Sequence, residues 1–256
     1  MHQSHSGYPF QIITSDDSAN LIADLQSRGL RYTKFFNHGR PIGFGKSDGT
    51  DTVAYSGMDA KPHELYFWGS GWSFDNLTSG CDGSGDLFGY KRGDNTNSVV
   101  CRGTDGHIHE IFLPPGGSWW TPADLSAPTN ADAPLAAGNP SAYVHSAKGI
   151  LPNLYNSNAT SYNSVVYRGT DGHIHELYRP FASLSWTHLD LSASAGGPPA
   201  VPAAGDPFGY VESDGYSSVV YRGTDGHIQE LYRPSNGSWS HGDISYAGGG
   251  TGAPAR

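Results

Sequence analysis

The sequence predicts an all-β protein built from one repeated four-stranded unit, and three observations support that fold class. A nine-residue motif recurs along the chain, short segments rich in β-branched and aromatic residues flank its copies, and 35 glycines and 17 prolines punctuate the 256 residues. Frequent glycine and proline predict many turns and few long helices. The 15 tyrosines, 10 phenylalanines and 6 tryptophans supply the bulk that a core with few aliphatic side chains needs.

The repeated motif reads Arg-Gly-Thr-Asp-Gly-His-Ile-His-Glu, and it ends at Glu110 and again at Glu176. A third copy ends at Glu230 with Gln229 in place of the second histidine, and a degenerate copy ends at Glu64. The four glutamates are separated by 46, 66 and 54 residues. Each copy closes with a tryptophan that is followed four positions later by aspartate or asparagine. Four short strands per repeat of this length are typical of a β-propeller blade.

The last copy shows the expected strands most clearly. They cover residues 208–213, 218–223, 227–233 and 238–245, and Thr224–Gly226 forms a tight turn between the second and third. A β-trefoil or a repeated β-sandwich is the alternative architecture. A trefoil needs three copies, and the chain has four, so the propeller is favoured.

The third strand of that copy predicts how the sheet is packed. Side chains alternate between the two faces of a strand, so Glu230 and Tyr232 point one way and Leu231 the other. Both faces carry apolar residues. A sheet packed between two neighbours requires this pattern, whereas a sheet with one solvated face does not.

The four repeats are expected to form one continuous domain over residues 41–256. Residues 1–40 do not match the unit, and we interpret them as a degenerate fifth blade or as strands that close the ring. Five blades are therefore expected. A four-bladed ring, or an incomplete ring completed by a second chain, remains an alternative.

Charge and hydropathy limit the partners. The formal net charge is −9 without any lysine- or arginine-rich block, which argues against nucleic acid or an anionic membrane as partner. No apolar run is long enough for a membrane span, so no membrane insertion is expected. Residues 1–8 lack the regions of a signal peptide. We expect an extracellular or secreted protein, with a cytoplasmic one left open.

Cys81 and Cys101 could form one disulfide, but the sequence does not decide whether they do.

The repeats resemble the blades of known lectins. The segment Val219–Tyr232 followed by Gly237-Ser-Trp239 resembles a blade of the fungal fucose-binding propeller lectins, and its Tyr-Arg-Gly-Thr-Asp-Gly-His stretch resembles the repeats of bacterial PLL-type propeller lectins. The resemblance covers residues 41–245. It implies a propeller with sugar sites between adjacent blades. In the fungal lectins such a site uses an arginine of the second strand, a glutamate of the third and aromatic residues of a neighbouring blade.

The glutamates and closing tryptophans of this chain match that pattern, but the arginine does not. The residues twelve positions before the glutamates are Thr52, Ser98, Ser164 and Ser218, and the arginines of the motif follow four positions later. A sugar offers an apolar C–H face and a rim of hydroxyls, so a site for it needs an aromatic platform and charged hydrogen-bonding groups. The predicted sugar-binding residues are Glu64, Glu110, Glu176, Glu230, Trp72, Trp120, Trp186, Trp239, Arg102, Arg168, Arg222, Tyr178 and Tyr232.

Each of these residues also has a structural interpretation. A tryptophan in every outer strand is commonly a packing residue, and repeated glutamates and arginines can pair with each other. Asp105, Asp171 and Asp225 are expected to form turns. The histidine pairs that begin at His107 and His173 could bind a transition metal, but Gln229 breaks the pattern, so no metal and no cofactor are predicted.

The prediction is a carbohydrate-binding lectin with several weak sites, which is not an enzyme and which binds glycans; a homo-oligomer is left open. The alternative is a polysaccharide lyase or glycoside hydrolase. Its site would lie near the insertion 148–162, with Tyr155 or Tyr162 as base beside His145, Arg168 and His173. A protein-binding platform is a third hypothesis.

Overall fold

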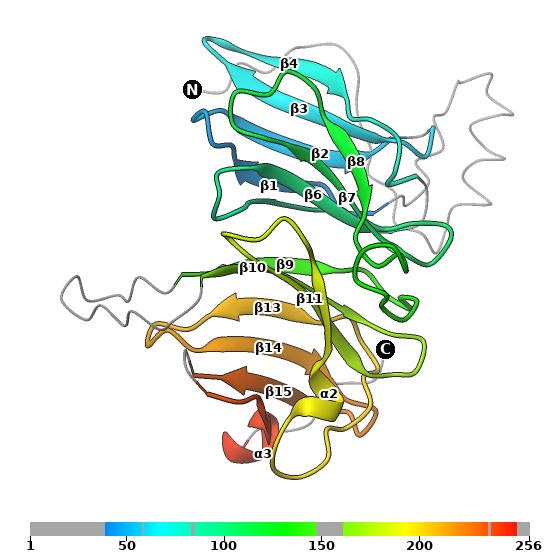
Figure 1. The fold of residues 1–256 in the computed structure, drawn as a ribbon, viewed down its shortest axis with the longest axis vertical. Coiled ribbons are helices and arrows are strands. Elements are labelled where there is room, and N and C mark those ends of the chain that lie inside the picture. The colour runs from blue at the N-terminus through cyan, green and yellow to red at the C-terminus, as the bar shows by residue number, and fades with distance from the viewer. Residues whose placement is uncertain (1–38, 58, 83–84, 147–160, 235–236, 250–256) are drawn as a thin grey trace, which may run out of the picture. The chain divides into compact units, whose positions relative to one another are not determined.

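The computed structural model describes residues 39–57, 59–82, 85–146, 161–234 and 237–249. The chain divides into two units, Met1–Phe36 and Asn37–Arg256, and every described residue lies in the second. The described residues form four antiparallel sheets of four strands each, which follow one another along the chain (Figure 1). The expectation of an all-β protein built from a repeated four-stranded unit is confirmed.

We call the sheets blades 1 to 4. Blade 1 contains β1 (Ile42–Gly45), β2 (Asp51–Ser56), β3 (Pro62–Trp68) and β4 (Gly71–Asn76). Blade 2 contains β5 (Phe88–Lys91), β6 (Asn97–Arg102), β7 (Ile108–Leu113) and β8 (Thr121–Asp124). Blade 3 contains β9 (Ser141–His145), β10 (Tyr162–Arg168), β11 (Ile174–Pro180) and β12 (Thr187–Asp190). Blade 4 contains β13 (Phe208–Val211), β14 (Ser217–Arg222), β15 (Ile228–Arg233) and β16 (Ser240–Asp243).

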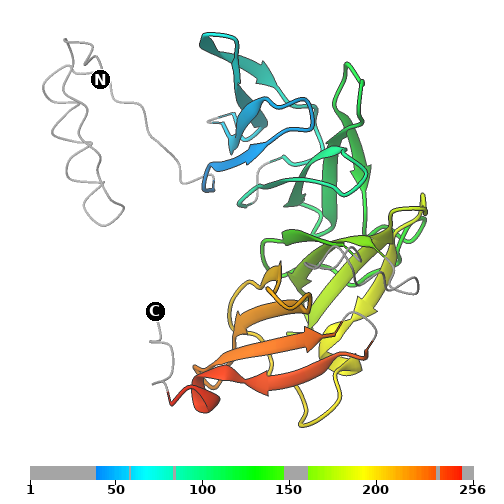
Figure 2. The same ribbon diagram turned by 90° about the vertical axis from the view of Figure 1, so that its left-hand side faces the viewer.

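The aspartate or asparagine that follows each closing tryptophan ends the fourth strand. The Asp243 carboxylate accepts a hydrogen bond from the Tyr246 N–H at 2.8 Å and caps the short helix α3 (Ile244–Ala247), which Figure 2 shows in red. Asp190 caps α2 (Leu191–Ser194) in the same way. An N-cap side chain satisfies a backbone donor that the first helical turn leaves unpaired. The last strand is therefore shorter than the expected 238–245.

The turn between the second and third strands has the predicted chemistry. Asp105 accepts a hydrogen bond from the His107 N–H at 3.0 Å, and Gly106 adopts a φ of +83°. Asp171 and Asp225 accept equivalent bonds at 3.0 Å. The prediction that these three aspartates form turns is confirmed.

Each blade has two distinct faces. We call the side that carries the motif glutamate the glutamate face, and the opposite side, which carries the residue after the glutamate, the leucine face. The hydrophobic core consists of three clusters, and each of them joins the glutamate face of one blade to the leucine face of the next. In the cluster between blades 2 and 3, for example, Tyr90 and Val100 pack with Val165, Leu177 and Trp186. Both faces of an inner blade are buried, as the sequence pattern predicted.

The linker that precedes a blade is tied to the second strand of that blade. In blades 3 and 4 a tyrosine hydroxyl does this, because Tyr167 donates to the Pro134 carbonyl and Tyr221 to the Val201 carbonyl, both at 2.9 Å. Cys101 stands at the same position of blade 2, and it forms a disulfide with Cys81. The open question of cysteine pairing is thereby answered.

Hydrogen bonds from a backbone N–H to an asparagine side chain also join neighbouring blades. The Ser47 N–H of blade 1 donates to Asn97 Oδ1 of blade 2, and the Gly93 N–H of blade 2 donates to Asn163 Oδ1 of blade 3, both at 2.8 Å. The asparagines occupy equivalent positions at the start of the second strand. Each asparagine fixes the register between two blades at the edge of the seam, the contact zone between adjacent blades.

Two predictions concern residues outside the described part of the chain. Residues 1–38 are not described, so a fifth blade or ring closure by residues 1–40 stays a prediction. Of the insertion 148–162, only residues 161 and 162 are described. Among the described residues, no helix is long and apolar enough to cross a membrane.

Candidate functional site

The motif glutamates lie on the third strand of each blade, and those of blades 1 to 3 face the seam with the next blade. Glu64, Glu110 and Glu176 are buried, and Glu230 of the last blade is half-buried. Each carboxylate accepts a hydrogen bond from the hydroxyl twelve residues earlier, which lies on the same face of the second strand, two positions from the residue that pairs with the glutamate. The bonds are Thr52 to Glu64 at 2.7 Å, Ser98 to Glu110 at 2.5 Å, Ser164 to Glu176 at 2.5 Å and Ser218 to Glu230 at 2.5 Å.

The seam between blades 1 and 2 brings three functional groups together. Glu64 Oε1 accepts a bond from Lys46 Nζ at 2.8 Å, and Glu64 Oε2 accepts one from the indole N–H of Trp120 at 3.2 Å. Trp120 belongs to blade 2, so the seam combines the carboxylate of one blade with the tryptophan of the next. Lys46 Nζ also lies 5.0 Å from the centre of the Tyr66 ring. This seam therefore places a cation and aromatic rings around one carboxylate.

The seam between blades 2 and 3 repeats the arrangement with arginines. Arg92 donates to both oxygens of Glu110 at 3.2 and 3.3 Å, and to Asp94 at 2.8 Å. Trp186 of blade 3 lies beside two guanidinium groups, 6.0 Å from that of Arg92 and 5.6 Å from that of Arg179. Arg179 also donates to Asp94. Both arginines thus share an acidic partner and an indole ring.

The seam between blades 3 and 4 uses a third arginine. Arg233 of blade 4 lies 4.9 Å from the ring centres of both Tyr162 and Trp239, and it donates to the Tyr162 hydroxyl. Glu176 accepts a bond from the Tyr143 hydroxyl at 3.1 Å. Glu176 Oε2 and the indole nitrogen of Trp239 are buried without a hydrogen-bond partner among the described residues. These are the two groups whose counterparts, Glu64 Oε2 and Trp120 Nε1, bond each other in the first seam.

Burial controls the ionisation of the seam carboxylates. Loss of solvent raises the pKa of Glu110 above its ordinary value, and the nearby Arg92 and the Ser98 hydroxyl only partly offset this. The pKa of Glu176 is raised for the same reason, with Arg233 and Ser164 as the opposing groups. Burial would lower the pKa of Arg233, but its electrostatic interactions with Tyr162 and Glu176 outweigh this effect and raise that pKa. In these two seams the ionised form of the glutamate therefore depends on the donors around it.

Sequence reasoning missed the cations that serve the first two seams. Lys46 and Arg92 stand 18 residues before Glu64 and Glu110, in the turn after the first strand, where the N–H of each bonds the carbonyl of Thr50 or Thr96 at 2.8 Å. Counting back 18 positions as well as 12 would have found both. In the other blades the pattern is lost, because Glu212 occupies this turn in blade 4 and the insertion in blade 3 obscures the spacing.

The predicted sugar-binding residues occupy different places. Tyr178 and Tyr232 pair with the serines of the second strand and so lie on the glutamate face. Trp120, Trp186 and Trp239 lie in seams, whereas Trp72 of the first blade is exposed. The binding roles of all these residues stay predictions.

The arginines of the motif lie at the turn end of the sheet. Arg102, Arg168 and Arg222 pair with Ile108, Ile174 and Ile228 at the end of the second strand. Four residues of strand separate each of them from the serine beside the glutamate, about 13 Å at ~3.3 Å per residue. Arg168 bonds the Ala137 carbonyl at 3.3 Å and pairs with Asp206 at 3.5 Å, both in linkers between blades. The site cations are Lys46, Arg92, Arg179 and Arg233, and no sequence pattern had singled these out.

Tyr155 lies outside the described part of the chain, and the described residues of the enzyme alternative are not assembled into one site. Tyr162 and Arg168 mark opposite ends of β10, about 20 Å apart at ~3.3 Å per residue. His145 stacks on Tyr162 with 4.8 Å between ring centres, but His173 pairs with Asp190 at 2.8 Å at the other end of the blade. Burial raises the pKa of Tyr162, which disfavours the phenolate that a base would need.

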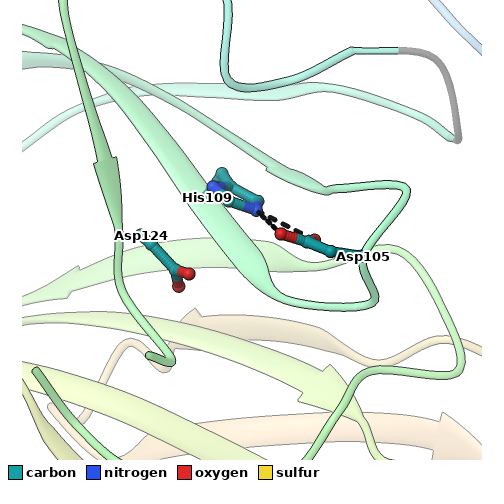
Figure 3. A group of neighbouring side chains, drawn as sticks. All are labelled: Asp105, His109 and Asp124. Carbon is teal, nitrogen blue, oxygen red and sulfur yellow. Dashed lines mark hydrogen bonds and ion pairs between the residues drawn. The ribbon is translucent and has the colours of Figure 1, made fainter. Parts of the chain in front are cut away.

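Three groups of aspartate and histidine lie at the turn ends of the blades. Figure 3 shows the group of blade 2, in which His109 Nε2 bonds both oxygens of Asp105 at 3.0 Å, while Asp124 lies across the strand. Asp124 bonds His107 at 2.6 Å and caps the following turn. In blade 4 the amide of Gln229 takes the place of His109 and donates to Asp225 at 2.9 Å. The groups of blades 3 and 4 contain His173 and His227, which bond Asp190 and Asp243 at 2.8 and 2.6 Å, so in all three blades a histidine hydrogen bond fastens the turn to the outer strand.

The comparisons with known proteins identify the fold. No family model and no curated protein matches the chain. Among solved structures, the chain resembles a mutant of Aleuria aurantia lectin in complex with Fucα1-6GlcNAc, with a TM-score of 0.56 and 18% identity over 88% of this chain and 67% of that one. It also resembles the lectin BP39L from Burkholderia pseudomallei, with a TM-score of 0.52 and 16% identity over 75% of this chain and 51% of that one. AofleA from Arthrobotrys oligospora gives a TM-score of 0.52 and 17% identity over 76% of this chain and 53% of that one.

These matches establish a β-propeller, as the sequence predicted. A further structure of the Aleuria lectin, described as a six-bladed β-propeller, matches with a TM-score of 0.54. The predicted resemblance to fungal and bacterial propeller lectins is confirmed at the level of the fold. The chain spans about half to two thirds of the length of these lectins.

Proposed function

We propose that this protein is a carbohydrate-binding lectin whose sites are the seams between adjacent blades. The observation that carries the proposal is the recurrence of one set of groups at three seams: a buried glutamate of one blade, the closing tryptophan of the next, and a lysine or arginine beside them. A site that recurs is expected of a multivalent binder, whereas catalysis needs one complete site.

The chemistry of each seam fits a sugar. An indole and a tyrosine ring can hold the apolar C–H face, and charged donors and acceptors can bind hydroxyls. The seam between blades 3 and 4 is the most favourable, because Glu176 Oε2 and Trp239 Nε1 offer a free acceptor and a free donor.

The structural neighbours suggest which sugar to test first. The Aleuria lectin was captured with α-methyl-L-fucoside and SapL1 with α-methyl fucoside. In this chain the cation reaches the glutamate from another position than in the fungal pattern. We therefore propose fucosides as the first ligands to test and leave the ranking of other sugars to the experiment. Individually weak sites would gain affinity by avidity on a surface rich in glycans.

We further propose an extracellular location and no enzymatic activity. The Cys81–Cys101 disulfide supports the location, because such bonds persist in oxidising compartments. The dispersal of Tyr162, Arg168 and His173 supports the absence of lyase or hydrolase chemistry among the described residues.

The test is glycan-array screening followed by calorimetric titration of α-methyl-L-fucoside and of the best array ligand. Trp120→Ala and Glu64→Gln should each remove one site per chain while the protein stays folded. Trp119→Ala is the matched control, because Trp119 is adjacent in sequence but exposed. Wild-type protein that binds no glycan at high density would refute the proposal. Equal effects of the Trp119 and Trp120 substitutions would also contradict it, and binding to a protein partner that sugars do not displace would favour the platform hypothesis instead.

A further inference from the structure

Two faces at the ends of the blade array carry seam residues yet remain exposed. On the leucine face of blade 1, the exposed fractions are 36% for Leu65, 58% for Trp72 and 55% for Phe74. The counterparts of Leu65 in the other three blades are fully buried: Ile111, Leu177 and Leu231. Blade 1 therefore presents the apolar face that every other described blade packs against its predecessor.

Blade 4 presents the opposite face. Phe208 is 52% exposed, and Val220 and Glu230 are half-buried on its glutamate face. The counterparts of Val220 in blades 2 and 3, Val100 and Val166, are fully buried by the next blade. The exposed face of blade 1 thus resembles the leucine-face side of an internal seam, and the exposed face of blade 4 resembles the glutamate-face side.

The two faces are complementary, because every seam inside the chain joins one glutamate face to one leucine face. The polar groups match as well. Asp51 occupies the place of Asn97 and Asn163, whose side chains accept a backbone N–H from the preceding blade. The corresponding donor on blade 4 is the backbone of Ser213, which is exposed, as is Asp51.

The functional groups are also divided between these faces. In the first seam Trp120 Nε1 donates to Glu64 Oε2. Trp72 is the counterpart of Trp120 on the exposed face of blade 1, and Glu230 is the counterpart of Glu64 on blade 4, already held by Ser218. Each end of the array therefore holds half of a seam site.

We propose that a second copy of this chain docks head-to-tail, so that the leucine face of blade 1 in one copy packs on the glutamate face of blade 4 in the other. The contact builds an additional seam from Glu230 of one copy and Trp72 of the other. That this seam binds a sugar rests on the proposed function, whereas the docking does not. A contact between two different faces is heterologous, so the rotation between copies decides whether it closes into a ring or continues as an open assembly.

The docking is tested by the mass of the full-length protein in solution, measured by sedimentation and light scattering over a range of concentrations. Wild type should reach at least twice the chain mass of 27.3 kDa. Leu65→Arg and Val220→Arg each disable one face and should leave a monomer. An equimolar mixture of the two variants should form a one-to-one dimer, because each retains the face that the other lacks. Leu184→Arg, an exposed position outside both faces, is the control and should associate as wild type does.

Two results of the mass measurement would contradict the docking. Wild type that stays monomeric at every soluble concentration overturns it, including the case in which residues 1–38 cover the two faces. Association that survives both face variants also overturns it. Calorimetry then separates the two claims: associated wild type should bind more sugar per chain than the monomeric Leu65→Arg variant, whose three internal seams are intact. An equal number of bound sugars per chain in the two proteins would refute the additional site alone. No sugar binding by either protein would refute the proposed function and leave the docking result unchanged.

Discussion

A pair of equivalent leucines tests whether burial in this protein is set by neighbouring blades. Leu177 and Leu65 occupy the same position after the motif glutamate, on the same strand and the same face. Leu177 is fully buried between blades 2 and 3, whereas Leu65 is 36% exposed. Replacement of each by alanine makes the same chemical change in two environments.

The expected losses in the free energy of unfolding differ between the two variants by roughly a factor of three. Leu177→Ala removes buried methyl groups and leaves a cavity in a packed seam, which costs about 3 kcal/mol within a range of ~2–5. Leu65→Ala leaves no enclosed cavity and forfeits only part of the ~1.5–3 kcal/mol that a fully buried leucine contributes, so about 1 kcal/mol is expected. For a domain of this size 1 kcal/mol shifts the melting temperature by about 2–4 °C.

Urea denaturation of both variants, followed by tryptophan fluorescence, measures the difference. The protein is kept at a concentration at which size measurement shows a monomer, since docking of a second copy would bury Leu65. Equal losses for the two variants would refute the reasoning, because they would mean that Leu65 is packed as tightly as Leu177. A smaller loss for Leu177→Ala would contradict the seam packing itself.

Two further predictions concern ionisation and the linkers. The hydrogen bond and charge of Asp243 raise the pKa of His227, so its stabilising interaction is present below about pH 6.5 and is lost as the pH rises through the folded-state pKa. An NMR titration should show the pKa of His227 falling in Asp243→Asn while that of His145 is unchanged; an unaltered His227 would refute the pairing. The Cys81–Cys101 disulfide closes a separation of 20 residues, so replacement of both cysteines by serine should cost about 3 kcal/mol. Tyr167→Phe removes the equivalent hydroxyl tether and should cost about 1 kcal/mol in the same denaturation assay, and a disulfide loss no larger than that would contradict the argument.

Much of the architecture could be predicted because the repeat constrains it locally. The spacing of the motif, its Asp-Gly turns and the alternation around Glu230 identified the four-stranded units and both of their faces. The end of the fourth strand was placed too late, since the helix cap at Asp243 is a local hydrogen-bonding choice that the strand pattern does not reveal. The sequence did not decide whether the two cysteines pair, because pairing depends on whether the linker lies beside the second strand of blade 2.

The composition of each seam followed the sequence only in part. Motif repetition predicted that a glutamate and a closing tryptophan would recur in every copy, 8 to 10 positions apart, and the seams bring Glu64 to Trp120 as expected of adjacent blades. The arginines of the motif drew attention because they are repeated, yet the cations beside the carboxylates come from less regular positions. Arg92 reaches Glu110 from the turn after the first strand, and Arg233 reaches the seam from the neighbouring blade.

By itself, the sequence determined the repeating unit, the order of its strands and which side chains share a face, because these depend on spacing within one blade. Only the tertiary structure decided which cation serves which seam and why Trp72 is exposed while Trp186 and Trp239 are buried. The physical reason is that a seam is made of two blades. Its contacts join residues 50 to 85 positions apart, as in the bonds from Ser47 to Asn97 and from Arg179 to Asp94, and their pairing is set by packing between sheets, which spacing along the chain does not encode.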